Sequence, residues 1–280
     1  HQVELFEAED EIGGQFGIAR KIPGKEEFAE TIRYYHRQLE LTGVKLHLGT
    51  RVTAGELVDG GFDEVVIATG VTPRVPDIPG IEHPSVLSYV DVVRHGKPVG
   101  DRVAVIGAGG IGVDVSEFLT HAESPTLDLT AWQAEWGVTD PESARGGLVE
   151  PKPGPSPRQV YLLQRKTSRI GKGLGKTTGW VHRAALKAKR VEQIAGVNYD
   201  KIDDAGLHIS FGAKRERPRV LEVDTVVVCA GQEPARELVD ELTMRGVVTH
   251  VIGGADVLDD AAELDAKRAI DQGTRLAAKL

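Results

Sequence analysis

The chain has 280 residues, of which 40% are hydrophobic and 27% are charged, and its formal net charge is −8 at pH 7. This length is enough for one large or two modest domains with a buried core. The acidic balance argues against a nucleic-acid partner, because proteins that bind phosphate backbones normally carry a basic excess. No apolar run approaches the roughly 18 residues of a membrane-spanning helix, and no signal-peptide pattern is present. We therefore expect a soluble, cytoplasmic protein that has no membrane partner.

The cysteine and methionine content bounds the chemistry further. Cys229 is the single cysteine, which excludes an internal disulfide and also a 4Fe–4S cluster held by cysteines of this chain alone. Because no second cysteine can pair with it, Cys229 is interpreted as a small buried strand residue and not as a redox thiol. Residue 1 is histidine and the single methionine is Met244, so we expect the chain to be a piece of a longer polypeptide.

The first third of the chain alternates strand-like and helix-like patterns. The predicted elements are strands at 3–7, 44–48 and 64–68 and a helix over 25–42, which ends before Gly43. Three prolines, Pro73, Pro76 and Pro79, follow the last of these strands. Because proline interrupts regular structure, this stretch indicates a crossing between domains.

A glycine-rich fingerprint lies in the middle of the chain. The sequence Gly-Ala-Gly-Gly-Ile-Gly at 107–112 follows a short apolar strand at 103–106 and opens a helix with an apolar stripe. In this context Gly107, Gly109 and Gly112 provide a tight turn, close backbone approach to a pyrophosphate and close helix packing. The amide groups at the start of the helix favour the negative charge of the phosphates. The pattern predicts a dinucleotide-binding site.

The second half repeats the alternation after an insertion. Residues 121–158 contain six prolines and predict a loop-rich insertion. A helix is predicted from Thr177 or Thr178, either of which could cap it, through Arg190, with Trp180 facing inward. Further strands are predicted at 160–164, 191–194, 206–211, 220–223, 226–231 and 248–252. A last helix is predicted from about Glu263 to the end.

These alternations predict an α/β fold. The central fingerprint is embedded in a second set of strands and helices, which indicates two doubly wound, Rossmann-like units with one nested inside the other. We expect a discontinuous outer domain of residues 1–95 and 225–280 and an inserted dinucleotide-binding domain of residues 96–224. The outer unit starts at what is typically its second strand, so we expect its first strand to be missing.

Residues near the start of the chain are candidates for a second dinucleotide site. Glu7 ends the first predicted strand, where a carboxylate commonly accepts hydrogen bonds from an adenosine ribose. Gly13, Gly14 and Gln15 follow, and glycine lets the backbone come close to a phosphate or a ring. The alternative is that Glu7 is a solvated acid in an acidic run and that the glycines only shape a turn.

The corresponding strand end of the inner unit is basic. Arg165 and Lys166 follow the strand at 160–164. A guanidinium and an ammonium group suit the 2′-phosphate of NADPH, whereas a carboxylate would repel it, so the pair predicts NADPH over NADH. The distance from Gly112 exceeds the usual spacing of about 20 residues, and the insertion at 121–158 accounts for the difference. A solvated basic pair is the alternative.

Asp256 follows Gly253 and Gly254 and precedes the last predicted helix. It is a candidate for a hydrogen bond to the ribityl chain of a flavin, while the positive end of the helix would stabilise an anionic reduced flavin. The alternative is an aspartate in a turn that caps the helix. The histidines show no metal-ligand spacing, so we expect no metal site. Residues 171–179 lack the spacing of a triphosphatase phosphate loop, and a basic loop near NADPH is favoured.

Four segments carry a family resemblance. They are Ile-Gly-Gly-Gln-Phe at 12–16, Ile-Pro-Gly-Lys-Glu-Glu-Phe at 22–28, residues 171–183 with Leu-Gly-Lys-Thr-Thr-Gly-Trp at 174–180, and Cys-Ala-Gly-Gln-Glu-Pro at 229–234. Together they resemble the carboxy-terminal part of bacterial NADPH-dependent 2,4-dienoyl-CoA reductases, which are multi-cofactor flavoproteins related to old yellow enzyme and trimethylamine dehydrogenase. The resemblance covers essentially the whole chain.

The resemblance implies that the chain is the module of such an enzyme that transfers hydride from NADPH to FAD, in fatty acid β-oxidation. It also implies partner domains in the same polypeptide, namely a barrel that holds FMN and the dienoyl-CoA site and a region with a cysteine-bound 4Fe–4S cluster. Single electrons pass through that cluster to FMN. No side chain of this chain is implied as a catalytic acid or base, because hydride transfer is the chemistry of the cofactors.

The resemblance also assigns cofactor contacts by position. The implied FAD contacts are Glu7, Gly14, Gln15, Thr69, Gly70 and Asp256. The implied NADPH contacts are Gly107, Gly109, Gly110, Ile111, Arg165 and Lys166.

Two other functions remain open at this point. One is a related NAD(P)H flavin oxidoreductase, such as a relative of enoate reductases or amine dehydrogenases, although the basic pair argues against the latter. The other is a non-catalytic adenine-nucleotide-binding module.

Overall fold

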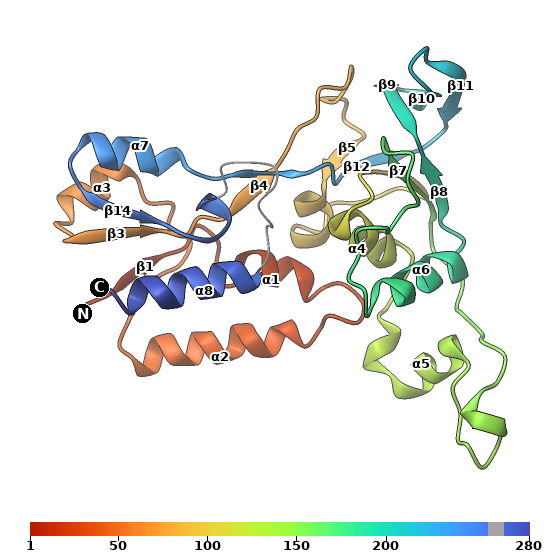
Figure 1. Ribbon diagram of the computed structural model, residues 1–280, viewed down its shortest axis with the longest axis horizontal. Helices are drawn as coiled ribbons and strands as arrows, with labels where there is room; N and C mark the ends of the chain where they lie inside the picture. Colours follow the sequence, from red (N-terminus) through yellow and green to blue (C-terminus); the bar gives the residue numbers. More distant parts are fainter. Residues whose placement is uncertain (257–265) are drawn as a thin grey trace. The chain divides into compact units, whose positions relative to one another are not determined.

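A computed structural model of the chain describes residues 1–256 and 266–280 (Figure 1). The chain divides into two compact units, each assembled from separate parts of the sequence. Unit 1 comprises residues 1–14, 30–72 and 232–280, and unit 2 comprises residues 15–29 and 73–231. The glycine fingerprint lies in unit 2.

Unit 2 is built on a parallel sheet. Its five strands lie in the order β5 (Val86–Ser88), β12 (Thr225–Val228), β6 (Arg102–Ile106), β7 (Gln159–Gln164) and β8 (Glu192–Ala195). The central strand β6 has Val103, Ala104, Val105 and Ile106 fully buried. Burial on both faces is typical of a parallel strand with layers above and below it, which explains the unbroken apolar run in the sequence.

The two faces of this sheet are covered by different structures. Val103 and Val105 belong to a cluster with residues of α4 (Gly110–Leu119) and α6 (Gly179–Ala188). Ala104 and Ile106, which point the other way because side chains alternate along a strand, belong to a cluster with the antiparallel strands. These strands are β9 (Val197–Asp203), β10 (Gly206–Phe211) and β11 (Glu216–Leu221).

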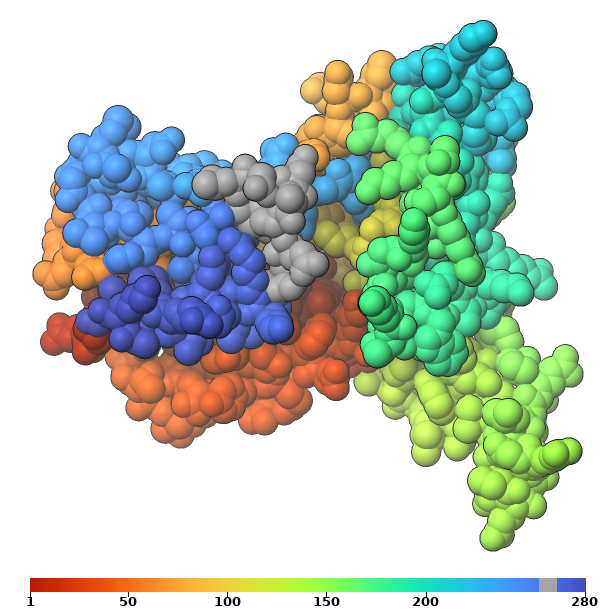
Figure 2. All heavy atoms as spheres, viewed as in Figure 1, coloured from red at the N-terminus to blue at the C-terminus, as the bar shows by residue number. Residues whose placement is uncertain are grey.

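The remaining regular segments of unit 2 are short. They are α1 (Gly14–Ala19), which begins at the boundary with unit 1, the π-helix η1 (Val90–Arg94), the 3-10 turns η2 (Pro125–Leu127) and η3 (Arg145–Gly147), and α5 (Leu129–Trp136). The last three lie in the proline-rich stretch, the yellow-green part of unit 2 in Figure 2.

The proline-rich stretch at 121–158 is mostly loop, as expected, but it also contains the helix α5. Asp128 caps its start, because its carboxylate accepts hydrogen bonds from the backbone amides of Thr130 and Ala131 at 2.8 and 3.0 Å. Gly137 ends it in the left-handed conformation, with φ of 67°. An aspartate at the start and a glycine at the end are ordinary helix boundaries, and the surrounding prolines obscured them.

The strands of unit 1 form separate two-stranded sheets. β1 (Glu4–Phe6) pairs in parallel with β2 (Lys45–His47), β3 (Glu64–Ile67) pairs in parallel with β14 (Val248–Val251), and β4 (Val71–Pro73) pairs with β13 (Gln232–Pro234). Among the described residues, no strand hydrogen-bonds β1 and β2 to β3 and β14. These two parallel pairs are therefore separate two-stranded sheets within unit 1.

The described helices of unit 1 are α2 (Phe28–Leu41), α3 (Ala54–Asp59), α7 (Glu237–Met244) and α8 (Ala266–Ala277). The first two residues of α2 group with unit 2. A 3-10 turn, η4 (Gly253–Asp256), follows β14. Thr53 and Glu56 form a reciprocal cap at the start of α3. Side chains of α3, β3 and α7, among them Leu57, Ile67 and Leu242, form a separate small core.

The α/β fold with doubly wound, Rossmann-like character is confirmed, and most predicted strands and helices are present within a few residues. Trp180 is an exception, because 60% of its surface is exposed although its helix was predicted to turn it inward. Thr178 occupies the cap position of α6 but its side chain makes no capping hydrogen bond. The start predicted near Glu263 for the last helix lies outside the described residues. No helix formed by the residues that are described is both long and apolar enough to cross a membrane.

The core of unit 2 makes a first prediction about stability. Leu162 on β7 is fully buried between α4 and the sheet, so Leu162→Ala should lower the free energy of unfolding by about 2–5 kcal/mol through lost burial and a cavity. Leu127→Ala is the matched control, because Leu127 is 74% exposed and should change stability by no more than about 0.5 kcal/mol. Urea unfolding of both variants measures the difference, and equal effects would contradict the assignment of this core.

Candidate dinucleotide site

Three segments that the sequence analysis singled out follow neighbouring strands of the unit 2 sheet. The strands β6, β7 and β12 are parallel, so their carboxyl ends lie at the same edge. The fingerprint follows β6, Arg165 and Lys166 follow β7, and Cys229 follows β12. In open parallel sheets, ligands bind outside the carboxyl ends of the strands, beside the crossover helices.

Two of the fingerprint glycines are required by packing within the protein. A Cβ atom on Gly112 would overlap the carbonyl oxygen of Gly107, and a Cβ atom on Gly107 would overlap the carbonyl oxygen of Cys229. Gly107 also has φ of 104°, which residues with a side chain rarely adopt. These two glycines let α4 pack directly on the turn that follows β6.

The two glycines between them face open space. A Cβ atom on Gly109 or Gly110 would meet no protein atom within 4 Å, and both residues are exposed. Gly109 is the N-cap residue of α4, and because glycine has no side chain, no side-chain atom of this residue accepts a hydrogen bond from the backbone amides of the first turn. The start of α4 thus presents backbone amides to an open surface, which is the arrangement that binds a pyrophosphate.

The basic pair lies next to this turn. The amide of Gly107 donates a 2.9 Å hydrogen bond to the carbonyl of Leu163, two residues before Arg165, and both Arg165 and Lys166 are exposed. Among the described residues, no carboxylate forms an ion pair with either side chain. The end of β7 therefore carries two exposed cations, and their role toward a 2′-phosphate stays a prediction.

Tyr199 is a site residue that the sequence analysis missed. It lies on β9, half-buried, beside the backbone of Gly107 and the guanidinium of Arg165. Burial raises the pKa of its phenol, and nearby Arg165 and the Gly107 backbone oppose that rise. Nothing in its sequence surroundings marks it, because the contact joins strands of two different sheets.

The implied flavin contacts fall mainly in unit 1. Glu7 follows β1, and its carboxylate accepts a 3.0 Å hydrogen bond from the backbone amide of Glu9. Gly14 has φ of +47° and open space around its Cα, so it fits close approach of a ligand. Gln15, in contrast, groups with unit 2, and its side-chain oxygen lies 3.5 Å from the Tyr89 hydroxyl.

Three further flavin candidates are held by contacts within unit 1. Thr69 donates its hydroxyl hydrogen to the carbonyl of Ala235, and the Gly70 carbonyl accepts from the Ala235 amide at 3.0 Å. Asp256 accepts hydrogen bonds from Arg268 and Gln272 of α8, at 3.1 and 2.7 Å. The aspartate thus ties the turn after β14 to side chains of α8. Its role toward a flavin stays a prediction.

A cluster of charged side chains lies on α4 behind the fingerprint. The Glu117 carboxylate is 2.9 Å from Nδ1 of His182, and the Asp114 carboxylate is 2.6 Å from Nζ of Lys25. One potential ligand atom from each of Asp114, Glu117 and His182 lies within 4.8 Å of the others. Spacing in the sequence did not reveal this cluster, because it joins three distant segments. The ion pairs already engage these groups, and the expectation of no metal site stays a prediction.

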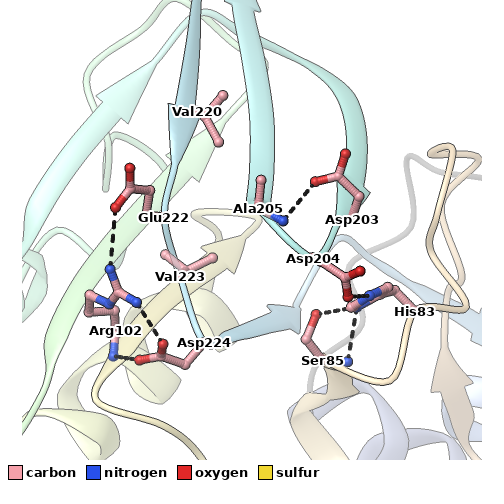
Figure 3. Close-up of a pocket in the computed structure, with 10 residues that line it drawn as sticks. All are labelled: His83, Ser85, Arg102, Asp203, Asp204, Ala205, Val220, Glu222, Val223 and Asp224. Atoms are coloured by element: carbon pink, nitrogen blue, oxygen red, sulfur yellow. Dashed lines mark hydrogen bonds and ion pairs between the residues drawn. The ribbon is translucent and has the colours of Figure 1, made fainter.

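A separate cavity of about 670 Å³ lies at the opposite edge of the sheet (Figure 3). It is lined by Arg102 at the start of β6, by His83, and by acidic residues including Asp203, Asp204, Glu222 and Asp224. Arg102 lies 2.9 Å from Asp224 and 3.6 Å from Glu222. None of the sequence-predicted site residues lines this cavity, and its acidic lining does not suit an anionic dinucleotide.

Comparison with known proteins identifies the family. The family described as "Pyridine nucleotide-disulphide oxidoreductase" matches residues 3–257. The chain belongs to this family. Its FAD- and NAD(P)-binding, Rossmann-like oxidoreductase fold is therefore shown.

Individual relatives are longer than this oxidoreductase chain. A metal reductase of Desulforamulus reducens is 28% identical over 265 residues, which are 91% of this chain and 37% of the relative. An N,N-dimethylglycine/sarcosine dehydrogenase of Chromohalobacter salexigens is 27% identical over 270 residues, 90% of this chain and 37% of the relative. The structure of a 2-naphthoyl-CoA reductase in complex with 2-naphthoyl-CoA superposes with a TM-score of 0.80 at 25% identity, over 100% of this chain and 36% of that one. The chain thus spans just over a third of the length of these relatives.

The family name refers to disulphide chemistry, which this oxidoreductase chain cannot perform with its own cysteines. Cys229 is the single cysteine and is buried after β12. Burial raises the pKa of its thiol, and a buried thiol with a raised pKa is a poor nucleophile. The structure agrees with the interpretation of Cys229 as a packing residue.

The fingerprint predicts contrasting effects of two alanine substitutions. Gly112→Ala should lower the free energy of unfolding by about 1–3 kcal/mol or more, because its Cβ would displace backbone. Gly109→Ala should fold normally, because its Cβ meets no protein atom, but it should bind a pyridine dinucleotide more weakly. Thermal unfolding and fluorescence titration measure the two effects. Normal nucleotide affinity in folded Gly109→Ala would contradict the site.

The cluster on α4 predicts a pH dependence of stability. The hydrogen bond with Glu117 raises the pKa of His182 above its ordinary value of 6.5; burial and Lys25 oppose this shift, while the charges of Glu117 and Asp114 support it. Because the folded-state pKa is raised, protonated His182 stabilises the fold fully below pH about 6.5, and this contribution is lost as the pH rises through the folded-state pKa. The stability difference between the wild type and His182→Gln should therefore be largest at low pH.

The control for this measurement is His95→Gln, which changes an exposed histidine of the same unit. Urea unfolding between pH 5.5 and 9 gives the comparison. A difference for His182→Gln that grows with rising pH would contradict the charged pair.

Proposed function

We propose that this chain is the module that transfers hydride from NADPH to FAD in an oxidoreductase of the 2,4-dienoyl-CoA reductase type. The observation that carries the choice of NADPH is the exposed pair Arg165 and Lys166 at the end of β7, without carboxylate partners among the described residues. A 2′-phosphate placed there would gain charge-assisted hydrogen bonds, whereas NADH has no group that needs them.

The geometry around the fingerprint supports this assignment. Gly109 and Gly110 leave open space in front of the first turn of α4, where the pyrophosphate would lie against backbone amides. Tyr199 packs beside Gly107 and Arg165, and it would hold the guanidinium at the ribose end of the nucleotide. In this arrangement the residues of the chain bind and orient the nucleotide, and the bound nicotinamide and flavin supply the redox chemistry.

The family membership and the resemblance to dienoyl-CoA reductases support FAD as the electron acceptor. The chain belongs to a family of FAD- and NAD(P)-binding oxidoreductases, and a CoA-thioester reductase is similar to it over its whole length. The four segments that resemble dienoyl-CoA reductases include Gly14 and Gln15 and also residues of α6. We infer that FAD contacts Glu7, Gly14, Gln15, Thr69, Gly70 and Asp256.

The remaining steps of the proposed reaction belong to other parts of the polypeptide. The chain covers 36–37% of the length of the relatives that match 90–100% of it. We propose that an amino-terminal barrel holds FMN and the dienoyl-CoA site, and that a cysteine-bound 4Fe–4S cluster carries electrons to the FMN. This cluster would lie outside the chain, because the single cysteine of this chain cannot hold it. Reduction of dienoyl-CoA in fatty acid oxidation would then be the activity of the whole protein.

An amine-oxidising relative provides the second candidate function. The C. salexigens dehydrogenase is as long a match as the metal reductase. An amine dehydrogenase passes electrons from its amine to an acceptor and has no need of a 2′-phosphate site, so the basic pair disfavours it. A module that binds adenine nucleotides without catalysis is the third candidate.

The decisive experiment uses the full-length flavoprotein without oxygen. NADPH should bleach the flavin absorbance, and a 2,4-dienoyl-CoA should restore it, whereas dimethylglycine should not reduce the enzyme. Flavin that stays oxidised in the presence of NADPH would exclude the proposed function. Reduction by the amine would instead select the second candidate.

The nucleotide preference has its own test. Replacement of both basic residues, Arg165→Ala with Lys166→Ala, should raise the dissociation constant of NADPH roughly 10- to 100-fold, because charge-assisted hydrogen bonds contribute about 1.5–3 kcal/mol. Binding of NADH should change little. Arg33→Ala with Lys45→Ala removes the same charge from the surface of unit 1 and serves as the control. Equal losses for both nucleotides would overturn the 2′-phosphate assignment.

A further inference from the structure

Four charged side chains that the proposed chemistry does not use meet on the side of α4. Lys25 contacts Asp114 at 2.6 Å, and His182 contacts Glu117 at 2.9 Å. Asp114 and Glu117 are three residues apart on α4, one turn after the fingerprint, and three-residue spacing places them on the same face. All four residues belong to unit 2.

Burial makes these contacts stronger than surface ion pairs. The Glu117 side chain is 8% exposed, and those of Asp114 and Lys25 are 21% and 28% exposed. Removal of one partner from such a partly buried pair leaves the other charge without compensation where water screens it less than at the surface, which is costly. When His182 is protonated, the cluster holds two positive and two negative charges. Asp114 and Glu117 lie on α4 and His182 lies on α6, whereas Lys25 comes from outside these two helices.

Lys25 belongs to a segment that leaves unit 1 and returns to it. Residues 15–29 group with unit 2, whereas residues 1–14 and 30–72 belong to unit 1. Ile18 and Ile22 of this segment share a core cluster with Val113 and Val115 of α4. The segment therefore packs on the helix of the fingerprint.

Polar contacts also hold the segment near its middle. The Gly24 amide donates a 3.1 Å hydrogen bond to the Thr126 hydroxyl, which in turn donates to Glu26 at 2.9 Å. Lys21 donates to the carbonyl of Arg94 at 2.8 Å. The contact of Lys25 with Asp114 differs from these, because its partner lies on α4 itself.

We propose that Lys25 and Asp114 are positioning residues for hydride transfer. Their ion pair fixes the segment that carries Gln15, an inferred flavin contact, on the helix whose first turn binds the NADPH pyrophosphate. This inference rests on the proposed function. Loss of the pair lets the segment shift against α4, and a misplacement of about 1 Å can slow a reaction roughly 100-fold without touching the reacting atoms.

The ion pair is not part of the nucleotide site, so its loss should slow flavin reduction without weakening the binding of NADPH. In full-length holoenzyme, Lys25→Met should slow flavin reduction at saturating NADPH by about 10-fold or more. The dissociation constant of NADPH should stay within about twofold. Lys25→Arg should restore most of the rate, because arginine also places a cation opposite Asp114.

The matched control removes a similar ion pair elsewhere in unit 2. Lys97 lies 2.7 Å from Asp91, and Lys97→Met should leave the rate of flavin reduction unchanged. Asp114→Asn provides a second, nearly isosteric variant that breaks the same contact from α4. Thermal unfolding and flavin content establish that each variant is folded and loaded before its rate is measured.

The outcomes distinguish the inference from the function on which it rests. A wild type that NADPH does not reduce overturns the proposed function. A wild type that is reduced, together with Lys25→Met or Asp114→Asn at the wild-type rate, overturns the positioning role alone. A parallel loss of NADPH affinity and rate also overturns it, because the pair would then act in binding.

Discussion

The close approach of Gly107 and Gly112 is the constraint on which the candidate site depends. Since a side chain at either position would overlap a backbone carbonyl, the turn after β6 can exist only with glycine there. This turn sets the direction of α4 and places the open surface of Gly109 and Gly110 beside the end of β7. The absence of a side chain at Gly107 and Gly112 consequently determines how the start of α4 lies relative to the carboxyl edge of the sheet and to the basic pair.

The alternation of side chains along β6 then determines the layers of unit 2. Val103 and Val105 pack with the helices, while Ala104 and Ile106 pack with the antiparallel strands. Because every one of these residues is fully buried, β6 cannot shift its register by one residue without exchanging the two faces. The position of the fingerprint relative to the sheet is therefore fixed by burial as well as by the glycines.

The sequence was sufficient for features that depend on local patterns. The fingerprint, the strands of the parallel sheet and α4 follow from periodicity and glycine spacing, so their prediction succeeded. Trp180 was placed wrongly, because a helical stripe tells which residues share a face but not whether another layer covers that face. The position of Tyr199 beside Gly107 and the contact of Lys25 with Asp114 could not be predicted, because each joins residues that are distant in the sequence. Tyr199 and Gly107 are 92 positions apart, and Lys25 and Asp114 are 89 positions apart.

Charge separates the two edges of the unit 2 sheet. The amino edge carries Asp203, Asp204, Glu222 and Asp224 around one cavity, whereas the carboxyl edge ends in Arg165 and Lys166. In a chain with a net charge of −8, a local concentration of positive charge beside the backbone amides of a helix start is a favourable place for the phosphates of the proposed nucleotide. The acidic composition that argues against a nucleic-acid partner thus also makes the basic end of β7 stand out as the proposed place for the 2′-phosphate of a dinucleotide.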